Sequence, residues 1–333
     1  TLGCFRASGS PNPVATLAEI PMIGGDRVKG MKASAGPGDF FFQNDYLAIS
    51  VDGAKFGQSF GQFHNPSRGL FAPSGGAILD FSSVKLDSAY SRYLPSDDMI
   101  ERLGVVVNQD PELPLVFSSY APTLTSDGLT LDMIGKLQDP TQKLSGVTRD
   151  SSNCVGNVSV SQQIKLGNKS RYLTVITTIT NNGTSTLPIR NIGDFLHQGG
   201  GGYRIVAPAY GSFSLDSSGN PLARVSNWGV NIPQSTEVNG TNFASPLATS
   251  VRAPYVIFLG SEPSDDTLDQ HSSIGVLPVT DGQVLVASDP QDSLGNPRPI
   301  FPSRLVVGGK EIPSLSPNTS IKYERRFYIT SGS

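Results

Sequence analysis

The chain has little charge: Lys, Arg, Asp and Glu make up 16% of its 333 residues, against roughly 25% in typical soluble domains. Its formal net charge is −3 and it has no run of Lys or Arg. This excludes a surface built to neutralise phosphates, so no nucleic-acid partner is expected. Long apolar runs are missing too, and no segment approaches the roughly 20 residues of a membrane-spanning helix.

Cysteine is nearly absent, with only Cys4 and Cys154. In an oxidising compartment a disulfide between them would close a loop of about 150 residues and stabilise the fold by roughly 4–5 kcal/mol. Two unrelated thiols are the alternative. The first residue is Thr1 and not Met, which predicts a secreted chain that has lost its signal peptide. A lipoprotein remnant at Leu2-Gly3-Cys4 is a second interpretation, although lipidation of Cys4 would have removed residues 1–3.

In place of charge the chain has 36 Gly and 25 Pro, with abundant Ser, Thr and Asn. These residues end strands, build turns and lower helix propensity, so the composition predicts many short strands. No helical pattern separates the strand-like runs, which disfavours βαβ units and a parallel sheet. No fixed-period repeat of the solenoid or propeller kind occurs either.

Strands are expected where β-branched and aromatic residues run between turn residues. These runs are residues 39–42, 46–51, 77–81, 104–108, 115–120, 129–134, 157–166, 172–180, 187–192, 203–206, 212–215, 222–225, 255–259, 274–279, 283–287, 304–307 and 321–329. The strongest is 172–180, and the turn Asn181-Asn182-Gly183 predicts a hairpin between it and 187–192. One short helical turn is expected at 99–103, capped by Ser96-Asp97-Asp98.

The proline-rich residues 1–37 predict an extended N-terminal arm. No linker divides the remainder, so residues 38–333 are expected to form one domain. Large β-sandwiches reach this size as single units. The sequence thus predicts an all-β protein, a large antiparallel sandwich preceded by an arm.

Four segments in this order resemble the super-sandwich of galactose-mutarotase-like domains: residues 38–51, 73–80, 172–195 and 315–327. They carry an Asn-Asp turn before an apolar strand, a Gly-Gly strand start, a Thr-rich strand with an Asn-Gly turn, and a Pro-containing turn into a closing strand. The resemblance is closest to the non-catalytic sandwich domain that accompanies a metal-dependent hydrolase domain in bacterial extracellular proteins. The His/Asp clusters of such a hydrolase are missing from this chain, so the resemblance implies the fold and not that activity.

A mutarotase-type site needs a His and a carboxylate that reach one sugar ring, and the nearest candidates are Asp194 and His197. A strand over residues 191–197 would put them on opposite faces. A polysaccharide lyase would use groups such as His64 and Arg68, because Arg clamps a uronate carboxylate and His abstracts a proton. A strand end and a polar surface loop are the alternative interpretations.

The predicted carbohydrate-binding set is completed by the single tryptophan: His64, Arg68, His197 and Trp228. An exposed indole can stack on a sugar ring, although a lone Trp is more often buried. Asp289 and Asp292 lie in an oxygen-rich loop that could bind calcium, but the loop lacks the spacing and final Glu of a helix–loop–helix site. Asp is also an ordinary turn residue, and no other cofactor is expected.

Two functions fit these observations. The first is a non-catalytic extracellular or cell-surface protein that self-associates into filaments or a lattice, with its arm pairing to a strand edge on a neighbour. The second is a carbohydrate-binding or carbohydrate-active protein, mutarotase-like or lyase-like, whose partner is an extracellular glycan. The sequence favours the first.

Overall fold

The β-branched and aromatic runs fold into antiparallel strands throughout the described part of the chain. The computed structural model describes residues 16–19, 28, 35–36, 38–53, 75–87, 92–95, 100, 102–108, 113–139, 142, 144–189, 191–197, 204–206, 237–238, 241–242, 251–253, 255–259, 272–279, 284–288 and 304–331. Within these ranges every strand pair is antiparallel and there is no α-helix. Accordingly, no described helix is long and apolar enough to cross a membrane.

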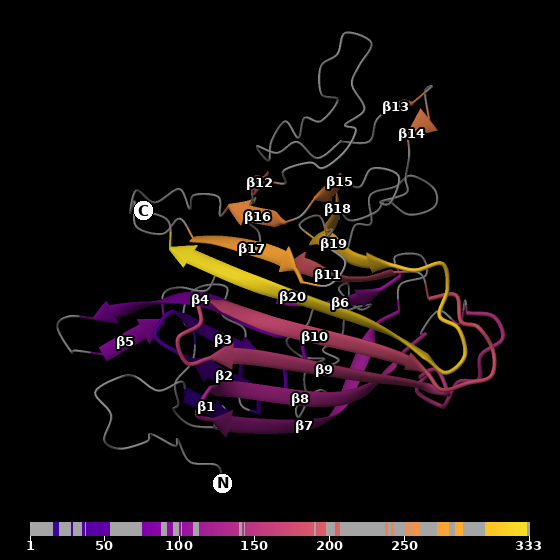
Figure 1. The fold of residues 1–333 in the computed structure, drawn as a ribbon, viewed down its shortest axis with the longest axis horizontal. Helices are drawn as coiled ribbons and strands as arrows, with labels where there is room; N and C mark the ends of the chain where they lie inside the picture. Colours follow the sequence, from indigo (N-terminus) through magenta and orange to yellow (C-terminus); the bar gives the residue numbers. More distant parts are fainter. Residues whose placement is uncertain are drawn as a thin grey trace.

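The strands form two large sheets and one short ribbon (Figure 1). The ten-stranded sheet has the order β1-β2-β3-β4-β6-β11-β19-β18-β15, with β5 paired to β4. Its strands are β1 (Thr16–Glu19), β2 (Phe40–Gln43), β3 (Leu47–Val51), β4 (Ile78–Asp87), β5 (Arg92–Pro95), β6 (Arg102–Val107), β11 (Asn191–His197), β15 (Val251–Ala253), β18 (Val284–Ser288) and β19 (Arg304–Glu311).

The eight-stranded sheet has the order β12-β16-β17-β20-β10-β9-β8-β7. Its strands are β7 (Leu115–Thr125), β8 (Gly128–Leu137), β9 (Val158–Gly167), β10 (Tyr172–Asn181), β12 (Arg204–Val206), β16 (Val256–Leu259), β17 (Ser272–Pro278) and β20 (Thr319–Ser331). The ribbon consists of β13 (Glu237–Val238) and β14 (Thr241–Asn242).

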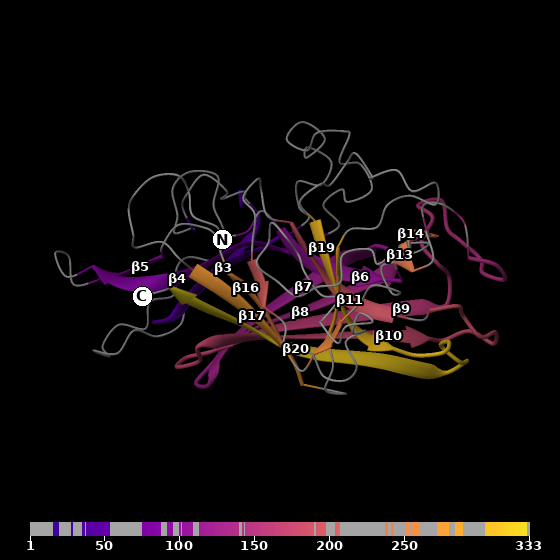
Figure 2. The ribbon, with the colours of Figure 1, turned by 90° about the horizontal axis from the view of Figure 1, so that it is seen from above.

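The core lies between the two sheets, which Figure 2 shows stacked on one another. Burial alternates along the strands: in β9, Val158, Val160, Gln162 and Ile164 are buried while the residues between them face outward. One apolar cluster joins such side chains from both sheets, among them Phe42 and Phe327. Each large apolar side chain that leaves water contributes roughly 1.5–3 kcal/mol. The two-residue period therefore accounts for the sandwich, and the predicted all-β antiparallel fold is confirmed.

The predicted strands are confirmed where they fall in the described residues, except that the run 187–192 is a strand only from Asn191. The hairpin between 172–180 and 187–192 is wrong, because β10 pairs with β9 and β20. Leu187 instead exchanges backbone hydrogen bonds of 2.9 and 3.0 Å with Leu315. The chain then crosses to the other sheet, where β11 pairs with β6 and β19.

The helical turn predicted at 99–103 is wrong at its end, because Arg102 and Leu103 begin β6, whose inward side chains join the core. The strands predicted at 212–215 and 222–225 lie outside the described residues. Within the predicted arm, β1 pairs with β2 and so adds an edge strand to the chain's own sheet.

Gly53, which follows β3, packs closely against the backbone of Gly38, which precedes β2. A substitution at Gly53 therefore tests how these two strands are arranged. A Cβ placed on Gly53 would lie 2.0 Å from the carbonyl oxygen of Gly38. Gly53→Ala is therefore expected to lower the free energy of unfolding by roughly 1–3 kcal/mol, since the backbone must shift. Gly36→Ala is the matched control, because nothing lies within 4 Å of a Cβ placed there. Urea unfolding measures both variants, and equal stability would contradict this packing.

Candidate functional site

Most of the predicted site residues lie outside the described residues: His64, Arg68, Trp228, Asp289, Asp292 and Cys4. His197 is described only as part of the β11 backbone, which confirms that residues 191–197 form a strand. Within the described ranges, no three His, Cys, Asp or Glu side chains are placed to hold a metal ion. The carbohydrate-binding set and the calcium loop thus stay predictions.

The predicted disulfide between Cys4 and Cys154 is not found, because Cys154 carries a free thiol. Its backbone N–H donates to Asp150 Oδ1 in a tight turn, and only 6% of the residue is exposed. Burial raises the pKa of the Cys154 thiol, so the thiol is not activated as a nucleophile.

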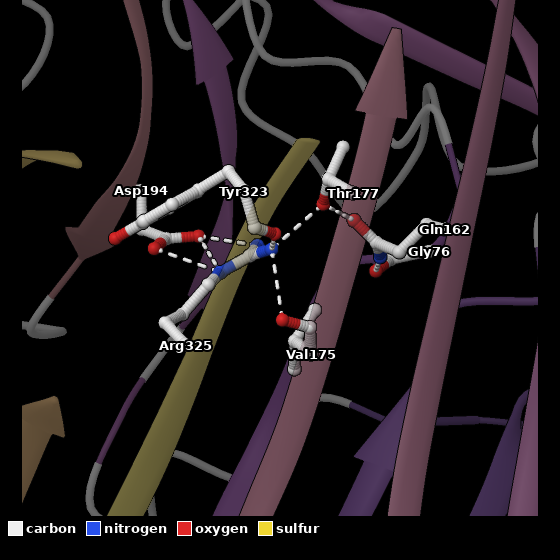
Figure 3. A network of polar contacts seen from close by, with 7 residues as sticks. All are labelled: Gly76, Gln162, Val175, Thr177, Asp194, Tyr323 and Arg325. Carbon is white, nitrogen blue, oxygen red and sulfur yellow. Dashed lines mark hydrogen bonds and ion pairs between the residues drawn. The ribbon is translucent and has the colours of Figure 1, made fainter. Parts of the chain in front are cut away.

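Arg325 and Asp194 form a buried ion pair between the sheets (Figure 3). Arg325 Nη2 lies 2.6 Å from Asp194 Oδ1, and Arg325 Nε lies 3.0 Å from each carboxylate oxygen. Both residues are 1% exposed. The local sequence explains this placement: Arg325 stands at an inward position of β20, between Tyr323 and Phe327, and Asp194 is inward on β11 beyond a bulge at Ile192/Gly193.

A relay of hydrogen bonds continues from this pair across the eight-stranded sheet. Arg325 Nη1 donates to Thr177 Oγ1 at 2.7 Å and to the carbonyl of Val175 at 3.3 Å. The Thr177 hydroxyl in turn donates to Gln162 Oε1 at 3.0 Å, and Gln162 Nε2 donates to the carbonyl of Gly76 at 2.7 Å. Five segments distant in sequence are thus joined by one network (Figure 3).

The electrostatics of this network follow from burial. Burial raises the pKa of Asp194, and the adjacent Arg325 guanidinium opposes the rise. Burial also raises the pKa of Tyr323 well above its ordinary value. Figure 3 shows the Tyr323 hydroxyl beside the Asp194 carboxylate, whose negative charge adds to the rise in the pKa of Tyr323. The guanidinium carbon of Arg325 lies 4.8 Å from the Tyr323 ring centroid, which adds a cation–π contact.

The network leaves little space between its side chains. Gly76, Gln162, Asp194 and Arg325 line a void of about 10 Å³, which is room for roughly one water molecule. The network therefore holds the two sheets at one relative position, and Asp194 is engaged by Arg325 rather than standing ready as an acid or base.

A second charged cluster lies on the ten-stranded sheet and is also buried. It consists of Asp39, Asp52, Asp80 and Arg102, of which no member is more than 8% exposed. Arg102 Nη2 lies 3.1 Å from Asp52 Oδ2. Asp39 accepts backbone N–H bonds from Gly36 at 2.8 Å and Gly53 at 2.9 Å.

Asp39 is the member of this cluster that titrates near neutrality. Burial raises its pKa to about 7, the carboxylates of Asp52 and Asp80 add to the rise, and the amides of Gly36 and Gly53 oppose it. Like the network between the sheets, this cluster is closed to solvent. Ionisation of Asp39 therefore changes the stability of the fold.

The outward face of the eight-stranded sheet is open, in contrast to both clusters. Figure 1 looks onto this face across β7, β8, β9, β10 and β20. Its exposed side chains are mostly polar, including Asp132, Lys136, Ser159, Ser161, Lys165, Ser320 and Lys322. Ile134 is 61% exposed among them. We call this surface the open face.

Two tyrosines and an arginine stand together on the open face. Tyr172 of β10 and Tyr328 of β20 are register partners, and their ring centroids are 5.3 Å apart. The Arg326 guanidinium carbon lies 4.7 Å from the Tyr172 ring centroid. On the other side of Tyr172's strand, Lys165 is the register partner of Thr174. These outward positions form an aromatic and hydrogen-bonding platform that the sequence predictions missed.

Comparison with known proteins gives fold-level likenesses. The chain is similar to the galactosidase domain of alpha-galactosidase-sucrose kinase, AgaSK (12% identity, 88% of this chain and 41% of that one, TM-score 0.44). It is also similar to a GH36 alpha-galactosidase, AgaB, from Geobacillus stearothermophilus (13% identity, 90% of this chain and 41% of that one, TM-score 0.42). A third similar structure is a galactose mutarotase-like protein from Clostridium acetobutylicum (10% identity, 88% of this chain and 95% of that one, TM-score 0.40). The chain thus spans about two fifths of these two galactosidases' length.

The predicted resemblance is confirmed in that mutarotase-like domains are among these similar structures. No family model matches the chain, and no curated protein matches it. The activities of the similar proteins are not carried over, because the likeness concerns the arrangement of strands alone.

Proposed function

We propose that this chain is a non-catalytic carbohydrate-binding sandwich domain that holds a glycan on the open face. The observation that carries the proposal is the Tyr172–Tyr328 ring pair, flanked by Arg326, on the open face, where all three side chains are partly exposed. Sugar rings offer apolar C–H faces that pack on aromatic rings, and hydroxyls that exchange hydrogen bonds with polar side chains.

The position of the carboxylates supports a non-catalytic role. Asp39, Asp52, Asp80 and Asp194 are each at most 2% exposed, and a general acid or base must come within hydrogen-bond reach of its substrate. On the open face, where a glycan has room, the described carboxylates Asp132 and Glu324 are engaged by Gln163 and Lys322, and the face offers a ligand rings, hydroxyls and cations. Binding without chemistry is the function these groups support.

The assembly role predicted from the sequence stays a prediction. The strand that residues 1–37 contribute, β1, pairs with β2 of the same chain, so this part of the arm is already used within its own sheet. The extracellular location likewise stays a prediction. Neither is needed for glycan binding on the open face.

Replacing either tyrosine tests the proposed function. Tyr172→Ala and Tyr328→Ala should each weaken glycan binding about tenfold, which corresponds to roughly 1.4 kcal/mol. Affinity electrophoresis in gels containing neutral or anionic polysaccharides provides the measurement. Tyr255→Ala is the matched control, because Tyr255 is a 40% exposed tyrosine ahead of β16. Failure of the wild type to bind any glycan, or equal losses in all three variants, would contradict the proposal.

A further inference from the structure

We propose that the open face is specific for linear polysaccharides that carry carboxylate groups, which lie across the strands. This inference rests on the carbohydrate-binding function proposed above and names the class of glycan. It depends on a line of four side chains that we call the cationic row: Arg326, Thr174, Lys165 and Thr130.

Strand register places the cationic row in line. Arg326 of β20 pairs with Thr174 of β10, Thr174 with Lys165 of β9, and Lys165 with Thr130 of β8. All four point outward, since burial alternates along each strand. Neighbouring strands are about 4.8 Å apart, so the backbones of Arg326 and Lys165 are separated by about 10 Å. A polymer laid across the strands therefore meets a cation, a hydroxyl and a second cation in sequence.

The two cations of the row have no anionic partner in the part of the chain that the structure describes. Other charges on the open face are already paired there: Lys136 lies 3.0 Å from Asp150, and Lys322 lies 3.2 Å from Glu324. The amide of Gln163 donates to Asp132. No described carboxylate forms an ion pair with Arg326 or Lys165, so both are available to a ligand anion.

The chemistry of the row matches a uronate. The planar guanidinium of Arg326 can hold a carboxylate through two parallel hydrogen bonds, and Lys165 adds a point charge. Stacking on Tyr172 fixes the plane of that guanidinium beforehand, which lowers the entropy lost on binding. The protein as a whole has a net charge of −3, so attraction of an anionic chain must come from this local surface.

The test measures the binding of the full chain to polygalacturonate by calorimetry or by affinity electrophoresis. Arg326→Gln and Lys165→Gln should each raise the Kd at least tenfold, and Arg326→Lys should recover part of the loss. Lys310→Gln removes the same charge from a partly exposed lysine of β19, in the other sheet, and should change the Kd less than twofold. The Kd of the wild type should also rise with salt concentration.

The outcomes separate this inference from the proposed function. Binding to neutral galactan with none to polygalacturonate would overturn the inference and leave the proposed function standing. Binding to no glycan at all would overturn both. Equal binding of dextran sulfate, or of single-stranded DNA, would show attraction of any polyanion and would also overturn the inference.

Discussion

Arg325→Met is expected to lower the free energy of unfolding by roughly 3–5 kcal/mol at neutral pH. The reason is the Asp194 carboxylate, which is 1% exposed and would lose its three contacts of 2.6–3.0 Å with the guanidinium. An unpaired charge in that position keeps the cost of burial and loses the attraction that offsets it. Urea unfolding followed by circular dichroism measures the change.

The double variant Asp194→Leu/Arg325→Met separates charge from packing. With both ionic groups replaced by apolar ones, stability should return to near the wild-type value, as for other buried pairs. The loss of stability caused by Arg325→Met should also become smaller as the pH is lowered. Burial raises the pKa of Asp194, so on acidification Asp194 is protonated in the folded state before it is protonated in the unfolded state. The cost of burying an unpaired charge therefore decreases as the pH approaches the pKa of Asp194 in the unfolded chain. Lys136→Met, which breaks an exposed pair with Asp150, should leave the Tm unchanged. A double variant as unstable as the single one would refute the charge argument.

Part of the buried network could have been predicted from the sequence. The period-two pattern of residues 157–166 puts Gln162 among inward side chains, and the structure confirms this. The same alternation over residues 321–329 places Arg325 inward, between Tyr323 and Phe327. An inward arginine in an apolar strand requires a buried anion. That signal was present in the sequence and pointed to a partner such as Asp194.

What sequence patterns could not supply is which strands become neighbours. β10 and β20 are adjacent in the sheet although they are far apart in the chain, so the Tyr172–Tyr328 pair is invisible in either segment alone. The predicted hairpin failed for a related reason. Asn181 Nδ2 donates to the carbonyl of Ser185 in the turn and also to that of Leu315, and this second, long-range contact helps to direct the chain away from a hairpin. The residues Asn181-Asn182-Gly183 thus predicted a change of chain direction, but they did not predict that β10 pairs with β9 and β20.

Ionisation of Asp39 is expected to make the free energy of unfolding depend strongly on pH. Its pKa rises from 3.8 in the unfolded chain to about 7 in the fold, chiefly through burial. The folded state therefore binds more protons than the unfolded state between these values, and stability falls as pH rises through that range. At about 1.4 kcal/mol per pH unit, this group alone removes roughly 4 kcal/mol between pH 4 and pH 7.

Asp39→Asn should abolish this part of the pH dependence. The variant cannot ionise at this position, so the difference in unfolding free energy between wild type and variant should decrease by roughly 4 kcal/mol from pH 4 to pH 8 and stay constant above that. The absolute stability of the variant is a poor readout, because its side-chain NH₂ replaces an oxygen that accepts from the amide of Gly36 or Gly53. The slope against pH avoids this problem, since the lost acceptor costs the same at every pH.

Asp132→Asn, at an exposed carboxylate on β8, is the matched control and should keep the wild-type slope. Urea unfolding at four pH values between 4 and 8 is sufficient to compare the three proteins. A parallel course of wild type and Asp39→Asn would mean that Asp39 stays ionised through its two backbone amides. The cluster with Asp52 and Asp80 would then carry its negative charge in the fold, and Arg102, which pairs with Asp52, would balance part of it.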